Sequence, residues 1–141
     1  MTRRVQAPGR AFAVSIVAAL CAMLVVATDA GARREKDRTG EVRVVGSCSA
    51  AATSKLKLKS RDGSIELEFE LDYNRVGTLW RVAIVHERRV AWKGAARTSG
   101  PSGVFSVDRR LPDLLGPDTV TARASGPAGI TCRATATLPA P

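Results

Sequence analysis

Apolar and polar residues alternate with a period of two along most of the chain between residues 41 and 138. This alternation predicts β-strands with one buried face and one exposed face, and no apolar stripe recurs at helical spacing over three turns. Turn signals rich in Gly, Pro and Asp separate the strands. The pattern predicts seven to eight short strands, within residues 41–45, 55–59, 65–71, 79–86, 90–96, 104–107, 119–125 and 130–138.

The second and third of these strands form the clearest unit. Three lysines alternate with leucines before Asp62-Gly63, and three glutamates alternate with apolar residues after it. Asp-Gly is a preferred pair for a two-residue hairpin turn. The predicted register then pairs Lys55 with Glu70, Lys57 with Glu68 and Lys59 with Glu66. A slip of one residue would set lysine against leucine, so both faces specify this register. We interpret the charge rows as a solvated sheet face.

The next two strands carry the two tryptophans, Trp80 and Trp92, in phase with apolar neighbours. This phase favours core packing over a carbohydrate-binding platform. A turn with an odd number of residues keeps both apolar sets on one face, and Glu87-Arg88-Arg89 satisfies that condition. We therefore predict a three-residue turn, with Trp92 opposite Ile84.

The number and spacing of the strands indicate an all-β fold, an immunoglobulin-like antiparallel β-sandwich. A central tryptophan and a cysteine in a late strand add to that expectation. Cys48 departs from it, because it precedes the 55–59 strand, whereas an antibody-type cysteine lies within a strand. Fold similarity of this kind implies no function.

The N-terminal segment indicates export. Three arginines precede the uncharged residues 11–27, and Ala30-Gly31-Ala32 supplies small residues at the positions that a signal peptidase reads. We predict a signal peptide over residues 1–32, a charged flexible leader over 33–40 and a sandwich domain over 41–138. The expected location is extracellular. The alternative is a membrane anchor formed by residues 11–27, near the lower end of the spanning range of about 17–25 residues.

Charge and cysteine content fit an exported domain. The formal net charge is +9, which favours anionic partners such as a cell-envelope polymer. Positive and negative residues are interleaved, so a soluble surface is the simpler interpretation and a nucleic-acid partner is not expected. Cys48 and Cys132 remain after cleavage, and an even pair in an exported chain predicts a disulfide.

Catalytic signatures are missing from the sequence. The single histidine, His86, ends a strand and has no partner motif. One histidine and a bridged cysteine pair do not supply the ligands of a zinc site. Gly100–Gly103 lacks the residues that follow in a phosphate-binding loop. We therefore expect no enzyme activity, no metal and no cofactor.

Two features are candidates for binding. Four basic residues surround one predicted turn and present groups that bind carboxylates or phosphates: Arg88, Arg89, Lys93 and Arg97. Surface solvation is the alternative role for them. The predicted loop over residues 109–117 is stiffened by prolines, which suits a protease inhibitor. Secreted subtilisin inhibitors have a similar length, but they carry two disulfides. We expect a secreted or envelope-associated binding or structural module that recognises an anionic polymer or a protein, with an exported protease inhibitor as the alternative.

The region 46–138 also resembles short exported actinobacterial proteins of uncharacterised function. The resembling segments are GSCS, the KLKL and IELEFEL strands, LWRV, PSGVFSV and GITCRA. None of them is a catalytic signature. The resemblance therefore implies a sandwich fold and brings no expectation of activity.

Overall fold

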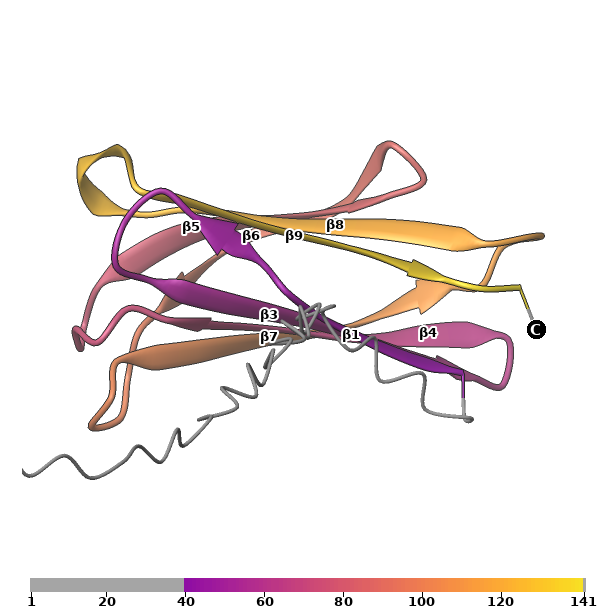
Figure 1. Cartoon of the computed structure of the whole chain (residues 1–141), viewed down its shortest axis with the longest axis horizontal. Coiled ribbons are helices and arrows are strands. Elements are labelled where there is room, and N and C mark those ends of the chain that lie inside the picture. The colour runs from indigo at the N-terminus through magenta and orange to yellow at the C-terminus, as the bar shows by residue number, and fades with distance from the viewer. Residues whose placement is uncertain (1–39, 141) are drawn as a thin grey trace, which may run out of the picture. The chain divides into compact units, whose positions relative to one another are not determined.

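The computed structural model describes residues 40–140, which form nine strands in two antiparallel sheets. One sheet has the order β1-β3-β4-β7 and the other β2-β9-β8-β5-β6, and they lie as two layers (Figure 1). The predicted signal peptide and residues 33–39 of the predicted leader lie outside the described residues. The strands are β1 (Glu41–Val45), β2 (Ser47–Cys48), β3 (Thr53–Arg61), β4 (Ser64–Asp72), β5 (Leu79–His86), β6 (Arg89–Arg97), β7 (Val104–Pro112), β8 (Asp118–Ser125) and β9 (Thr131–Leu138).

The fold is the expected immunoglobulin-like sandwich in its two antiparallel layers, but the chain runs through the four-stranded sheet in a different order. In an immunoglobulin domain, the strand that pairs with the second strand comes later in the chain, after a strand of the other sheet. Here β4 occupies that place and follows β3 directly through the Asp62-Gly63 turn. The chain then forms the β5–β6 hairpin, returns to the first sheet as β7, and ends with the β8–β9 hairpin.

The predicted register of the β3–β4 hairpin is confirmed. Lys55, Lys57 and Lys59 lie opposite Glu70, Glu68 and Glu66, and Leu58 and Leu56 lie opposite Leu67 and Phe69. Both turn residues have positive φ angles, as the type I′ turn that Asp-Gly favours requires.

The inward-facing residues of the two sheets form one core. Trp80 is fully buried in it, in edge-to-face contact with Tyr73 at 5.3 Å between ring centroids. Trp92 is half-buried at the edge of the sandwich, where the guanidinium of Arg109 from the opposite sheet stacks on its ring at 4.0 Å. Both tryptophans therefore serve packing, as their sequence phase predicts.

The predicted three-residue turn between β5 and β6 is wrong. His86 pairs with Arg89, so the turn contains only Glu87 and Arg88, both with positive φ. A register shift between Ile84 and Val85 then restores the predicted pairing of Ile84 with Trp92. Two hydrogen bonds between Glu87 and Thr119 of β8 stabilise the short turn. The Glu87 N–H donates to the Thr119 carbonyl oxygen, and the Glu87 carboxylate accepts the Thr119 N–H.

The strand predicted over residues 104–107 is longer than expected, and this corrects the loop predicted over 109–117. Strand β7 continues to Pro112 because it pairs with β4 along its whole length. Arg109 and Arg110, which showed no apolar alternation, lie within it. The loop between β7 and β8 is therefore only residues 113–117.

The chain crosses from the first sheet to the second at Gly46. Its backbone lies so close to its neighbours that an added Cβ would sit 2.3 Å from Ser54 Oγ and 2.6 Å from the Arg133 carbonyl oxygen. Real Cβ atoms do not approach other atoms so closely, so this crossing requires glycine. It sets β1 against β3 and β2 against β9.

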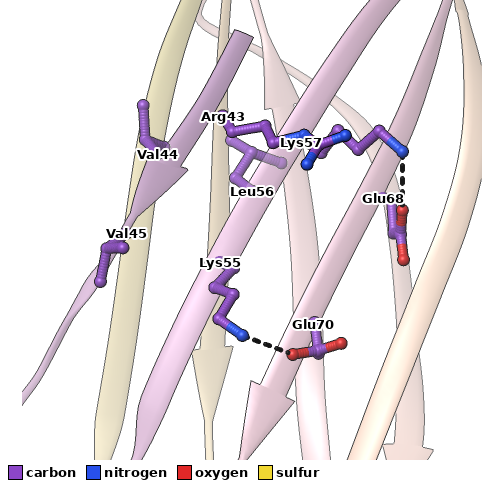
Figure 2. A pocket seen from close by; sticks show the side chains of 8 residues that line it. All are labelled: Arg43, Val44, Val45, Lys55, Leu56, Lys57, Glu68 and Glu70. Carbon is purple, nitrogen blue, oxygen red and sulfur yellow. Dashed lines mark hydrogen bonds and ion pairs between the residues drawn. The ribbon is translucent and has the colours of Figure 1, made fainter. Parts of the chain in front are cut away.

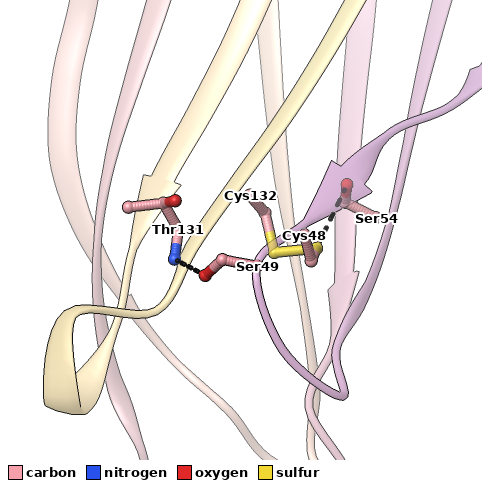
Figure 3. Close-up of a disulfide and its surroundings, with 5 residues drawn as sticks. All are labelled: Cys48, Ser49, Ser54, Thr131 and Cys132. Atoms are coloured by element: carbon pink, nitrogen blue, oxygen red, sulfur yellow. Dashed lines mark hydrogen bonds between the residues drawn. A yellow bond between two sulfur atoms is a disulfide. The ribbon is translucent and has the colours of Figure 1, made fainter.

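The predicted Cys48–Cys132 disulfide is present (Figure 3). It joins directly opposite residues of neighbouring strands in one sheet, with Cα atoms 4.1 Å apart, and it closes a sequence separation of 84 residues. It thus differs from the antibody bridge, which links two sheets. Strand β2 has only two residues, so this bond supplies much of what holds it to β9.

Replacing both cysteines, Cys48→Ser with Cys132→Ser, is expected to lower the free energy of unfolding by about 2–4 kcal/mol, because the unfolded chain regains loop entropy. Urea denaturation of the oxidised wild type, the reduced wild type and the double variant measures this. Equal midpoints for the first two would contradict it. Thiol titration of the unfolded, non-reduced exported protein should find no free thiol.

Candidate functional site

The four basic residues predicted as one patch do not form one. Arg88 lies in the β5–β6 turn, and Arg89 pairs with the buried His86, which places it on the inner-face side. Lys93 and Arg97 pair with Ala83 and Leu79 on the outer face. Arg89 and Arg97 stand at opposite ends of β6, about 27 Å apart at the usual rise of a strand. Arg97 also donates to the Gly77 carbonyl oxygen at 2.6 Å.

Two of these residues belong instead to a larger cluster on the outer face of the five-stranded sheet. Arg133 of β9 lies opposite Arg123 of β8, Arg123 lies opposite Ala83 of β5, and Ala83 lies opposite Lys93 of β6. Arg81 and Arg97 extend the cluster along β5 and β6. All five side chains are exposed. We call this set the basic face: Arg81, Lys93, Arg97, Arg123 and Arg133.

The basic face contains no carboxylate among the outward positions of its strands. Most other outward residues are small or hydroxylated, with the apolar exceptions Leu79, Val85 and Val90. Two threonine pairs form a hydroxyl ladder beside the arginines. Thr121 and Thr135 lie 3.0 Å apart, and Thr119 and Thr137 lie 3.1 Å apart, between Oγ1 atoms. The charged groups on this surface are therefore all positive.

The outer face of the four-stranded sheet has the opposite character, because its charges alternate in sign. Lys55 Nζ lies 3.2 Å from Glu70 Oε1, and Lys57 Nζ lies 3.5 Å from Glu68 Oε2 (Figure 2). A hollow beside Val44 and Val45 is bordered by these same ion pairs. Its charged groups already have partners, as expected of a solvated sheet face.

Two arginines hold the Glu66 carboxylate on this face. The carboxylate contacts Arg110 at 3.1 Å and Arg61 at 3.4 Å, rather than the opposed Lys59. Desolvation raises the pKa of the Glu66 carboxyl, but the hydrogen bonds and charges of Arg110 and Arg61 outweigh this and lower the pKa below its ordinary value. The excess positive charge of the domain therefore lies on the basic face.

Arg81, Arg123 and Arg133 were not singled out from the sequence. Each does lie at an outward position of the period-two pattern, which is a detectable signal. The three arginines lie together because β9, β8, β5 and β6 are neighbours in the sheet, and a local sequence pattern does not reveal that order. The sequence analysis selected basic residues that are close together in the sequence, and those lie around the β5–β6 turn.

A second polar cluster lies at one end of the sandwich. His86 Nε2 lies 2.5 Å from Asp118 Oδ1, and both side chains are buried. Asp118 Oδ2 accepts the Leu114 N–H at 3.2 Å, and Glu87 Oε1 accepts the Thr119 N–H at 2.5 Å. The atoms of His86, Glu87 and Asp118 that could bind a metal ion lie within 4.8 Å of one another. Both carboxylates already take part in hydrogen bonds within the protein, so we assign this cluster a structural role.

This cluster anchors the 113–117 loop. Asp118 fixes the backbone of Leu114 at the base of the loop, and the Asp113 N–H donates to the Gly63 carbonyl oxygen at 3.3 Å. Leu115 at the tip is fully exposed. The loop is therefore held at both ends and presents one large apolar side chain to solvent.

Asp118→Ala is expected to lower the free energy of unfolding by about 1–3 kcal/mol, because it leaves a buried histidine nitrogen and the Leu114 N–H without their acceptor. Asp118→Asn keeps one carbonyl oxygen as an acceptor and should cost less. Urea denaturation ranks the two variants. Faster amide exchange at Leu114 should accompany the alanine variant, and stability equal to wild type would contradict the anchoring role.

Comparison with protein-family models, with curated proteins and with solved structures found no match for this chain. Among residues 40–140, no helix is long and apolar enough to cross a membrane. The site must therefore be interpreted from its own geometry.

Proposed function

We propose that this chain is an exported binding module without catalytic activity, which holds an anionic polymer of the cell envelope against its basic face. The observation that carries the proposal is the segregation of charge between the two sheets. One outer face pairs lysine with glutamate, whereas the other sets arginine against arginine with no carboxylate between them.

That arrangement lowers the stability of the free protein, because like charges directly opposite each other in a sheet repel. A polyanion laid across the face supplies the missing opposite charge. The row from Arg133 to Lys93 crosses four strands, or about 15 Å at the usual strand spacing. An extended polymer can contact several of these charges at once.

Two further observations support the proposal. The disulfide is typical of an oxidising, extracellular compartment, in agreement with the export signal expected over residues 1–32. The single histidine is buried against Asp118, which suits a structural role better than that of a catalytic base. An actinobacterial source and kinship with the short exported proteins named above remain part of this proposal.

The test compares two variants with the same change in net charge. In the basic-face variant, threonine replaces Arg81, Lys93, Arg123 and Arg133. In the control variant, threonine replaces Lys55, Lys57, Lys59 and Arg110 on the outer face of the other sheet. Threonine suits exposed strand positions. The basic-face variant should elute from a heparin or wall-polymer column at clearly lower salt than wild type, because each lost contact removes counterion release.

The control variant should elute closer to wild type, and circular dichroism should show that both variants keep the fold. The salt dependence of binding should also become shallower only for the basic-face variant, because fewer counterions are released. Equal elution of the two variants would show that retention follows net charge alone, and the proposal would fail.

A second candidate function is an exported protease inhibitor, and the fully exposed Leu115 on its anchored loop favours it. A loop held at both ends loses little entropy when an enzyme binds it. A protease with an apolar specificity pocket should then be inhibited, and Leu115→Gly should abolish the inhibition. Absence of inhibition across a panel of subtilisin-like and chymotrypsin-like proteases would exclude this candidate.

A further inference from the structure

The strongest concentration of unpaired charge on the basic face lies beside the disulfide. A hollow of about 450 Å³ opens there between β2, β8 and β9. Apart from Arg123 and Arg133, the side chains that line it are small: Ser47, Cys48, Ser49, Ala124, Ser125, Thr131 and Cys132. Small residues leave the two arginines room to turn their guanidinium groups toward a common ligand.

The hollow offers hydrogen-bond donors in excess of acceptors. Within residues 40–140, neither guanidinium makes a hydrogen bond or an ion pair with a side chain or a backbone group. The Ser49 hydroxyl accepts the Thr131 N–H at 3.1 Å, so its own proton is free to donate (Figure 3). Ser47 lies directly opposite Arg133, on the same face.

The number of donors selects the ligand. A carboxylate carries a single negative charge, so it leaves one of the two arginines without a counter-charge. Its two oxygens would also have to be shared among two guanidinium groups and a serine hydroxyl. A phosphate monoester has three peripheral oxygens and a charge of about −1.5 to −2 near neutral pH, which matches two arginines.

We propose that the hollow between Arg123 and Arg133 binds a phosphate group. This inference rests on the proposed function and deepens it, because it makes the anionic polymer one that carries phosphate. Each guanidinium donates to phosphoryl oxygens, and Ser49 donates to a third. The polymer presents this group as a pendant monoester, because a diester within its backbone has only two free oxygens and a single negative charge.

NMR of the arginine side-chain N–H groups tests the subsite directly. Titration of the oxidised protein with inorganic phosphate should shift the signals of Arg123 and Arg133 saturably, and the signals of Arg81 and Arg97 much less. Arg123→Gln and Arg133→Gln should each weaken phosphate binding by roughly tenfold, the loss of one charge-assisted interaction. Lys93→Gln, on the same face but outside the hollow, should change it less than twofold.

Small probes test the kind of phosphate group. Glycerol phosphate, a monoester, should bind more tightly than dimethyl phosphate, a diester, and the reverse order would overturn the inference. Acetate that binds as tightly as phosphate would overturn the inference. Equal shifts at all the basic residues would also overturn it, because they indicate diffuse attraction without a site.

Failure of the subsite and failure of the proposed function give different results. If the basic-face variant loses retention on the polymer column but phosphate shifts neither Arg123 nor Arg133, the module stands and the subsite is wrong. If phosphate binds in the hollow while polymer retention is unaffected by the basic-face substitutions, the subsite stands and the polymer function is wrong.

Discussion

The register between β3 and β4 is the constraint on which the sandwich depends. It buries Leu56, Leu58 and Phe69 completely, on one side, and sets the lysines against the glutamates on the other. A slip of one residue would bury the charges and expose the leucines, at a cost far above the stability of a small domain. Strands β1 and β7 pair with the two outer edges of this hairpin, so their buried residues must lie on the same face as those of the hairpin.

The same alternation does not determine how a turn is built, and the β5–β6 hairpin shows the limit of sequence reasoning. A three-residue turn and a two-residue turn with a bulge both place Trp92 opposite Ile84. What separates them is Glu87, whose contacts with Thr119 of β8 hold the shorter turn. That contact spans two hairpins, so no local pattern reports it. The consequence for the site is large, because the bulge turns Arg89 away from Lys93.

Strand identity was thus predictable from the chain, whereas the candidate site was not. Alternation marks Arg123 and Arg133 as outward residues, and the cysteine pair correctly predicts the tie between β2 and β9. The grouping of the arginines depends on which strands are neighbours, and on the five-residue separation of β8 and β9 that sets Arg123 opposite Arg133. The charges on the outer face of the four-stranded sheet balance one another, so the excess positive charge of the domain lies on the basic face.

The disulfide connects stability with the proposed site. Strand β2 offers only two residues for pairing with β9, and Gly46 permits the crossing that brings it there. The Cys48–Cys132 bond therefore keeps Ser47 and Ser49 beside the two arginines. Reduction would release one wall of the hollow while the core, built from the longer strands, persists. Binding of a phosphate group at the proposed site should consequently be more sensitive to reduction of the disulfide than folding is.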